Sequence, residues 1–435
     1  MDIELPRRVA YQDLRFALAQ FYERSFARDL SNCQFDWRKT QWVSLPELVT
    51  ILSWASRLVH AGKDVSWLLP NPAVKQEGLA DARERIRPVV SKDVFSDVAR
   101  KVDELKSIAG QRKLRPGQRH SALDQLLVHI LERHPNIRVE AENWLDAEVG
   151  PLAYQDLLGF FWRYKVFEQA SDAGIRFMPD PRTLATAPLE YAGDTPCLEL
   201  CPIRSSNDVE TLVENLRKPS ELQRVLGTYS QMDVVSRGAL AHILVNELGR
   251  NVDEHADASG AWLCTRLVRP SDYRFQIKGD PAESCLTRFT DGFLEVIVCD
   301  NGAGLANRIE PVIKRDPRRA ILQKYRSADG KYAAKDLVDY AFDRLASSKR
   351  DIVDLVHWDT AGKGDPGPLS SGLYWIWNLV RSHEGVLEVR SSGVCGWYDF
   401  TGIASSTQTK ETFQIDGKSF PCCGTMVRIC LPIRQ

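Results

Sequence analysis

Apolar residues near the start of the chain change their spacing twice, which predicts two strands with a helix between them. Residues 33–43 are rich in aromatic side chains and predict a strand, residues 45–61 have apolar side chains at helical spacing, and residues 65–69 form a second apolar strand. Ser44 is typical of an N-cap, and Glu47 three residues later completes the pattern of a capping box. We therefore expect strand, helix and strand in this order.

The chain after this region interrupts the pattern and then resumes it. Residues 73–140 are charged, helical in period and broken by prolines, which predicts a helical insertion, while residues 154–175 predict a helix and a strand. Residues 1–72 and 141–205 are therefore assigned to one N-terminal α/β domain, which resembles STAS-like domains of partner-switching regulators; an unrelated α/β regulatory domain is the alternative. The resemblance implies a phosphorylatable serine at a helix start, where Ser44 stands, although a plain N-cap explains it equally well.

A helix predicted over residues 240–256 carries a set of polar side chains on one face. Glu247, Asn251 and His255 are spaced four residues apart and therefore stack along that face. An amide oxygen can occupy one site on Mg²⁺, and a carboxylate one turn away can orient a water. An exposed polar helix face is the alternative interpretation.

An apolar strand predicted over residues 293–299 runs into a D-x-G-x-G pattern. Asp300 at the strand end can accept the exocyclic amino group of a purine, and Gly302 and Gly304 allow the backbone to come close to a ligand. Alone, such a pattern is also typical of an ordinary turn.

Two further segments near the C-terminus complete the set. Residues 370–385 contain Gly372 at the start of an amphipathic helix, whose free amide groups and dipole favour a phosphate, and residues 386–391 follow as a strand. Residues 423–432 predict a closing strand. Each segment by itself is also compatible with plain core architecture.

Together, in this order, these segments resemble the signature of the GHKL superfamily, which contains DNA gyrase, heat-shock chaperones, histidine kinases and mismatch-repair ATPases. The match spans roughly residues 235–435. Glu247 and Asn251 resemble the N box, and residues 300–304 resemble the first glycine box. The region of Gly372 resembles the second glycine box, and Gly424-Thr425 resembles the last one.

The resemblance implies an α+β fold in which a Bergerat-type α/β sandwich, a mixed sheet covered by helices, forms residues 206–435. Residues of about 305–369 would contain the mobile ATP lid, with a helix at 336–345 and a hinge at 362–367. One departure is at residues 370–373, which read Ser-Ser-Gly-Leu where the family carries a G-x-G-L-G-L pattern. Serine hydroxyls would then replace part of the backbone contact with phosphate.

The resemblance also implies a role for each matching residue. Glu247 would be the general base, Asn251 would hold Mg²⁺ and the phosphates of ATP, and Asp300 would bind adenine. Thr425 would support the water network beside Asp300. The other residues expected to bind the nucleotide are Gly302, Gly304, Lys349, Gly372, Leu373 and Tyr374.

Composition narrows the set of partners. The chain has 57 Lys and Arg against 58 Asp and Glu, a formal charge of −1, so no global positive field indicates nucleic acid or an anionic membrane. It lacks a signal-peptide pattern and an apolar run of membrane-spanning length, which predicts a cytoplasmic protein. Its 10 cysteines show no paired C-x-x-C elements of a zinc site and are expected to be buried free thiols.

The function expected from the resemblance is a Mg-ATP-dependent conformational switch with slow hydrolysis, which signals to a regulatory partner protein. A homodimer is compatible with this function. A serine/threonine kinase of anti-sigma type and a non-hydrolysing ATP-binding module are the alternatives. Typical histidine kinases carry an amide where this chain has Glu247. His242 on the entering helix is a solitary histidine, which is more often structural than a phosphoacceptor.

Overall fold

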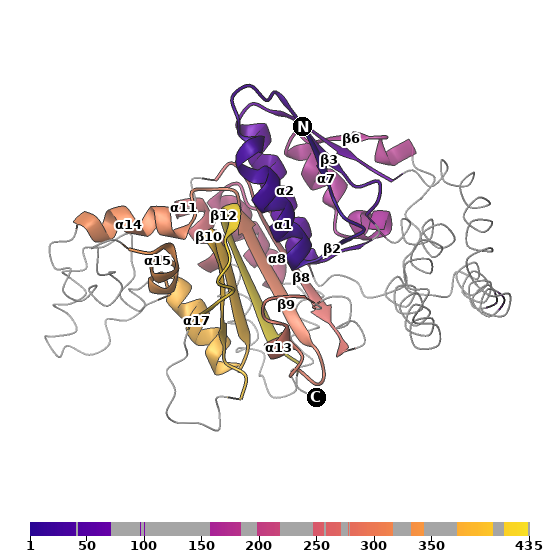
Figure 1. The fold of residues 1–435 in the computed structure, drawn as a ribbon. Coiled ribbons are helices and arrows are strands. Elements are labelled where there is room, and N and C mark those ends of the chain that lie inside the picture. The colour runs from indigo at the N-terminus through magenta and orange to yellow at the C-terminus, as the bar shows by residue number, and fades with distance from the viewer. Residues whose placement is uncertain are drawn as a thin grey trace, which may run out of the picture.

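A computed structural model gives the fold of most of the chain. It contains a four-stranded sheet, a six-stranded sheet and a separate pair of short strands (Figure 1). Besides Ser96, Arg100 and Ile277, the described residues are 1–40, 42–70, 157–183, 198–217, 247–255, 258–270, 279–315, 332–342, 372–402 and 413–433.

The four-stranded sheet belongs to the N-terminal part and is parallel throughout. Its order is β1 (Asp2–Glu4), β3 (Asn32–Asp36), β5 (Asp64–Leu68) and β6 (Arg176–Met178). Neighbouring parallel strands need crossover connections, which α1 (Tyr11–Ser25) and α2 (Leu45–His60) supply here. The structure thus confirms the helix predicted over residues 45–61.

The strand predicted over residues 33–43 is in fact two strands in different sheets. β3 ends at Asp36, whose carboxylate accepts the backbone N–H of Arg38 at 2.9 Å and turns the chain. The chain then enters β4 (Trp42–Val43), which pairs with β2 (Arg8–Val9). The sequence pattern did not indicate the end of β3, because buried tryptophans lie on both sides of the turn.

The predicted capping box at the start of α2 is wrong. Ser44 has the extended backbone of an N-cap, but its hydroxyl makes no cap hydrogen bond, and the residue is 3% exposed. Glu47 is 2% exposed and lies 2.9 Å from the guanidinium of Arg390. A buried carboxylate is stabilised more by a full positive charge than by one backbone amide, so tertiary packing overrides the local pattern.

The six-stranded sheet is antiparallel in every pairing of the described strands, whereas a mixed sheet was expected. Its order is β11 (Gln414–Ile415), β10 (Val386–Asp399), β12 (Phe420–Pro432), β9 (Phe293–Asp300), β8 (Ala261–Val268) and β7 (Leu198–Pro202). Successive strands such as β8 and β9 return alongside each other, which produces antiparallel neighbours. Because β7 pairs with β8, the sheet begins before residue 206, the expected domain boundary.

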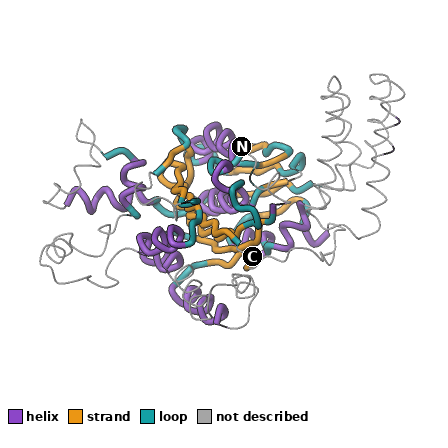
Figure 2. Tube along the Cα trace, turned by 90° about the horizontal axis from the view of Figure 1, so that it is seen from below, coloured by secondary structure: helices purple, strands orange, loops and turns teal. Residues whose placement is uncertain are grey.

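Helices cover both faces of this sheet (Figures 1 and 2). Alternate residues of β9 separate the two cores: Val296 and Val298 pack on one side, Ile297 and Cys299 on the other. α1 and α2 of the N-terminal part cover the second side. The first side is covered by α8 (Ser206–Arg217), α11 (Leu248–His255), α15 (Ala334–Tyr340) and α17 (Gly372–Ser382), and α14 (Leu305–Arg315) packs against α15.

A row of buried charges crosses the face under the N-terminal helices. In this buried ionic network, Arg428 donates to Glu295 at 2.7 Å and to Glu388 at 2.8 Å, and Glu388 also accepts from Arg390 at 2.7 Å. Charges are tolerated in a core when they are paired in this way. The members are Glu47, Arg266, Asp280, Glu295, Glu388, Arg390 and Arg428, with further ion pairs Arg266–Glu295, Arg428–Asp280 and Arg390–Glu47.

Several sequence predictions can be placed only in part. The insertion at 73–140 lies outside the described residues except for Ser96 and Arg100, and Lys349 and residues 362–367 lie outside them as well. Within the expected lid, α14 and α15 are packed helices, and α15 begins two residues before the predicted start at 336. Among the eight cysteines whose side chains the structure describes, all are free thiols and six are buried. None of the helices in the described ranges is long and apolar enough to cross a bilayer.

Candidate functional site

The end of β9 positions a buried carboxyl group. Asp300 is 6% exposed, and its Oδ1 accepts the backbone N–H of Gly302 at 2.8 Å. Burial raises the pKa of Asp300 to about 7, while hydrogen bonds from the amides of Gly302 and Thr425 act in the opposite direction. The strand thus ends in an acceptor that is held by backbone donors and shielded from water.

Two glycines leave room for close backbone approach around Asp300. Gly424 has φ +68°, and a Cβ at this position would overlap the carbonyl group of Asp300. Its N–H donates to the carbonyl of Gly302 at 2.9 Å. Gly304 has φ +82°, and its Cβ would lie 2.8 Å from the hydroxyl of Ser392. The first and last glycine segments of the sequence pattern therefore lie against each other.

Thr425 lies beside Asp300, and its backbone N–H donates to the Asp300 carboxyl group. It is 8% exposed, and its hydroxyl lies 3.0 Å from that of Ser391, its register partner on β10. Ser391 Oγ and Ser392 Oγ accept the N–H groups of Leu305 and Ala306 at 2.8 and 3.1 Å. These two serines cap α14, a role that the sequence prediction missed because they are 86 residues away along the chain.

α11 carries Asn251, and Glu247 immediately precedes the helix. Leu248 and Val252 anchor it in the core, and the helix contacts both β9 and α17. Asn251 is half-buried, and its Nδ2 is buried without a hydrogen-bond partner among the described residues. Glu247 is half-buried one turn earlier. A buried amide donor that no described group satisfies is a position where a ligand would be favourable.

The remaining predicted contacts lie at the start of α17. The helix begins at Gly372, as expected, and Leu373 is buried in the core that α11 shares. Tyr374 stacks on Trp377, with ring centroids 6.3 Å apart. α17 therefore brings the second glycine segment next to α11.

Asn301 is a site residue that the sequence prediction did not single out. It is fully buried, and its Oδ1 accepts the N–H groups of Ser259 and Gly260 at 2.9 and 3.0 Å. Its Nδ2 donates to the hydroxyls of Ser56 and Ser259 at 3.1 and 2.9 Å. The only sequence signal was its place after Asp300, since its partners come from distant segments.

The N-terminal part also contacts Asp300 itself. Ser53 on α2 donates its hydroxyl to the backbone carbonyl of Asp300 at 2.9 Å, and Ser56 one turn later contacts Asn301. The candidate site and α2 are therefore joined by hydrogen bonds at two consecutive residues of the strand end.

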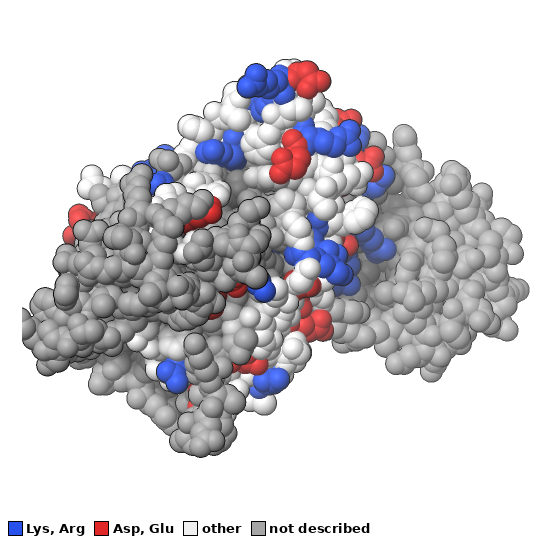
Figure 3. Space-filling model, turned by 60° about the vertical axis from the view of Figure 1, so that its left-hand side comes forward, with Lys and Arg blue, Asp and Glu red and all other residues white. Residues whose placement is uncertain are grey.

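The described residues contain no group of three His, Cys, Asp or Glu side chains that could hold a metal ion. A Mg²⁺ ion coordinated by one amide oxygen, phosphate oxygens and waters needs no such group, so Asn251 fits the expected ligand type. On the face shown in Figure 3, positive and negative side chains of the described residues are interspersed.

No protein-family model matches the chain, and neither the curated proteins nor the solved structures provide a match.

Proposed function

We propose that this chain binds Mg-ATP between the end of β9, α11 and α17, in the manner of the GHKL superfamily, and acts as a conformational switch with slow hydrolysis. The observation that carries the proposal is the buried carboxyl of Asp300, enclosed by Thr425 and by glycines of two separate segments. A carboxylate in such a position can accept the amino group of adenine. Gly424 and Gly304 let the neighbouring segments close tightly around this carboxyl group.

Asn251 and Glu247 would act at the phosphate end of the site. The unsatisfied amide of Asn251 fits a role beside phosphate and Mg²⁺, the latter through its oxygen. Bound ATP would supply the phosphoryl group, and Glu247 would accept a proton from the attacking water. The antiparallel sheet departs from the mixed sheet of the family, so the proposal rests on the site and not on the sheet.

Contacts with α2 support a switch. Ser53 and Ser56 bond to the two residues that would be closest to the base, so a change at the nucleotide site reaches the N-terminal part directly. A partner protein bound to that part would then sense the nucleotide.

The proposal is tested by titrating the chain with a non-hydrolysable ATP analogue and Mg²⁺. Asp300→Asn replaces an acceptor oxygen by a donor facing the adenine amino group, and we expect affinity to fall about tenfold to a hundredfold. Asp291→Asn, in the exposed turn at the opposite end of β9, is the matched control. Equal affinity in Asp300→Asn and the control would contradict the adenine assignment.

Turnover distinguishes the alternatives. Release of free phosphate supports a hydrolysing switch, whereas transfer of label to a protein supports the anti-sigma-type kinase. Tight binding without either product supports a non-hydrolysing module.

A further inference from the structure

Ser391 on β10 joins two segments next to the Asp300 carboxyl group, β12 and the start of α14. It is fully buried, and its hydroxyl accepts the N–H of Leu305 at 2.8 Å and donates to the carbonyl of Gly424 at 3.1 Å. The hydroxyl of Thr425 lies 3.0 Å away. A hydroxyl has one hydrogen and two acceptor positions, so Ser391 accepts from Thr425. Every hydrogen-bonding position of this side chain is therefore committed to one of the two segments.

The turn from Asp300 to Leu305 is held at both ends. At its start, the N–H of Thr425 donates to the Asp300 carboxyl group, and the Thr425 hydroxyl contacts Ser391. At its end, Leu305 donates its N–H to the same serine. A movement of the carboxyl group would therefore be passed to the start of α14 through Ser391.

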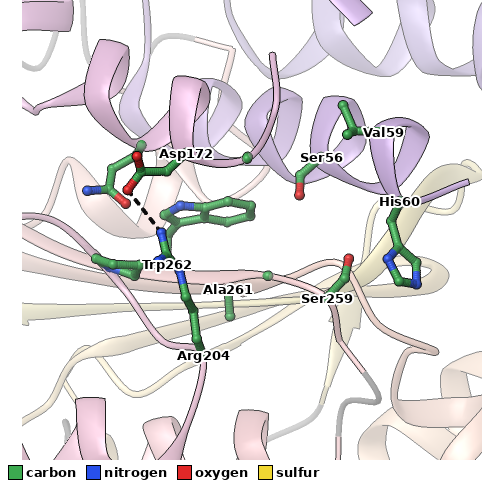
Figure 4. A pocket seen from close by; sticks show the side chains of 12 residues that line it. Ser56, Val59, His60, Asp172, Arg204, Ser259, Ala261 and Trp262 are labelled. Atoms are coloured by element: carbon green, nitrogen blue, oxygen red, sulfur yellow. Dashed lines mark hydrogen bonds and ion pairs between the residues drawn. The ribbon is translucent and has the colours of Figure 1, made fainter. Parts of the chain in front are cut away.

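α2 anchors the start of this turn separately. Asn301 donates to the hydroxyls of Ser56 and Ser259 at 3.1 and 2.9 Å. Figure 4 shows these two serines pointing toward each other, from α2 and from the residues before β8, in the lining of a pocket. Because the first residues of the turn are anchored, a change in the turn is expressed mainly at its other end, where Ser391 holds it.

The backbone of β10 is distorted where it makes these bonds. Its pairing with β12 is irregular between Ser391 and Gly393, and Ser392 and Gly393 have left-handed backbone, with φ of +54° and +82°. In a regular strand, neighbouring side chains point to opposite faces, whereas Ser391 and Ser392 accept N–H groups from two successive residues of α14. A left-handed serine costs free energy and persists where its surroundings fix it, often beside functional sites. The distortion therefore aligns both hydroxyls with the start of α14.

α14 also carries a charge that acts on Asp300. Burial raises the pKa of Asp300 to about 7, whereas two backbone amides and the positive charge of Arg308 lower it. Arg308 lies in the first turn of α14, so the serines that cap this turn also fix the position of the charge. Ser391 therefore favours the ionised form of Asp300 in two ways, through Thr425 and through α14.

We propose that Ser391 is a positioning residue, which holds the Asp300 carboxyl group in its binding orientation and passes base binding on to the start of α14. A base that bonds to the carboxylate would fix it, and with it Thr425, Ser391 and the N–H of Leu305. The start of α14 would then become more rigid when the base is bound. This coupling rests on the proposed function, whereas the positioning of Asp300 does not.

The positioning role is tested in the full chain without nucleotide. The carboxyl groups of selectively labelled aspartates are titrated by NMR, and Asp300→Asn identifies the signal of Asp300. In Ser391→Ala the pKa of Asp300 should rise above its wild-type value, because Thr425 and the charge on α14 are held less firmly. Thr40→Ala should leave it unchanged; Thr40 is also fully buried, and its hydroxyl donates to the carbonyl of Pro6 at 3.0 Å. An equal pKa in Ser391→Ala and wild type would overturn the positioning role.

The coupling is tested by hydrogen exchange of the peptide that covers residues 303–310, with and without saturating adenosine. In wild type we expect adenosine to slow exchange at the start of α14 by at least about threefold. The effect should disappear in Ser391→Ala and remain in Ser392→Ala, which removes a cap of α14 and keeps the link to Thr425. The same adenosine effect in Ser391→Ala as in wild type would contradict the coupling.

Thr425→Val provides a second variant should Ser391→Ala fail to fold. Valine keeps the N–H that bonds to Asp300 and lacks the hydroxyl that contacts Ser391, so the pKa of Asp300 should again rise and the adenosine effect should again disappear. Wild-type behaviour of Thr425→Val in both measurements would overturn the proposal. If adenosine does not bind to wild type, the proposed function fails, while the titration of Asp300 still decides whether Ser391 positions it.

Discussion

Asp300 carries a carboxyl group whose protonation changes close to neutral pH. Burial is the main cause that raises its pKa, to about 7, and only the deprotonated form presents both oxygens as acceptors. The amino group of a bound base would therefore face a mostly protonated carboxyl group at pH 6 and a mostly ionised carboxylate at pH 8.

We predict that adenosine binds more tightly as pH rises through 7. The carboxylate fraction of Asp300 grows from about one tenth at pH 6 to about nine tenths at pH 8, so affinity should rise up to about tenfold. Adenosine avoids the phosphate titration of ATP near pH 6. Calorimetry across this range tests the prediction, with Glu47→Gln as a control that should keep the same profile. A flat profile would show that Asp300 does not accept from the base.

Glu247 tests the chemistry of the site separately from binding. The carboxylate would contact the attacking water and not the base, so Glu247→Ala should keep ATP affinity while kcat falls by about 10²–10⁴-fold. Phosphate release and analogue affinity are measured on one preparation. Glu210→Ala, exposed on α8, is the control. Unchanged kcat in Glu247→Ala would remove the general-base role.

At the scale of elements, β12 and β9 meet where a side chain has no room. Gly424 combines a left-handed backbone with direct contact to the backbone of Asp300, whereas Gly417 has φ +70° and open space around it. A substitution at Gly417 therefore introduces backbone strain alone, whereas a substitution at Gly424 introduces both strain and steric overlap.

We predict that Gly424→Ala lowers the free energy of unfolding by about 2–4 kcal/mol and abolishes nucleotide binding, because strain and overlap add. Gly417→Ala carries only the strain and should cost about 1–2 kcal/mol. Denaturant unfolding of both variants gives the comparison. Equal losses would show that the contact between Gly424 and Asp300 relaxes without cost.

At the scale of the whole molecule, the buried ionic network joins the N-terminal helices to the six-stranded sheet. Glu47 of α2 lies 2.9 Å from Arg390, yet burial dominates and raises the pKa of Glu47 from 4.5 to about 7. The folded state therefore binds this proton more tightly than the unfolded state. The resulting stability is present below pH 4.5 and is lost as pH rises through about 7.

Glu47→Gln should remove this dependence. Glutamine stays neutral at every pH, so the variant does not lose this stability as pH rises. The unfolding free energy of the variant minus that of wild type should therefore increase by up to about 3 kcal/mol between pH 5 and pH 8. Glu4→Gln, whose side chain is 70% exposed, is the control. Parallel curves for Glu47→Gln and wild type would show that Glu47 is ionised throughout this range.

The sequence by itself determined the elements that carry the predicted site. Apolar runs located β9 and β12, helical spacing located α2 and α17, and the glycines marked the turns beside Asp300. These features depend on residues within a few positions of one another, so their physics is local and can be read from the chain.

Only the tertiary structure decided which elements pack against each face of a strand or helix. Glu388 and Arg390 alternate with apolar residues, as solvent-facing positions do, yet both are buried because α1 and α2 pack on that face. Glu47 forms an ion pair with Arg390 and does not cap its own helix. Asn301 donates to the hydroxyl of Ser56, which is 245 residues away along the chain. The cause is the same in each case: a buried polar group must be satisfied by whatever packs against it, and that neighbour is fixed by the topology of the chain and not by adjacent residues.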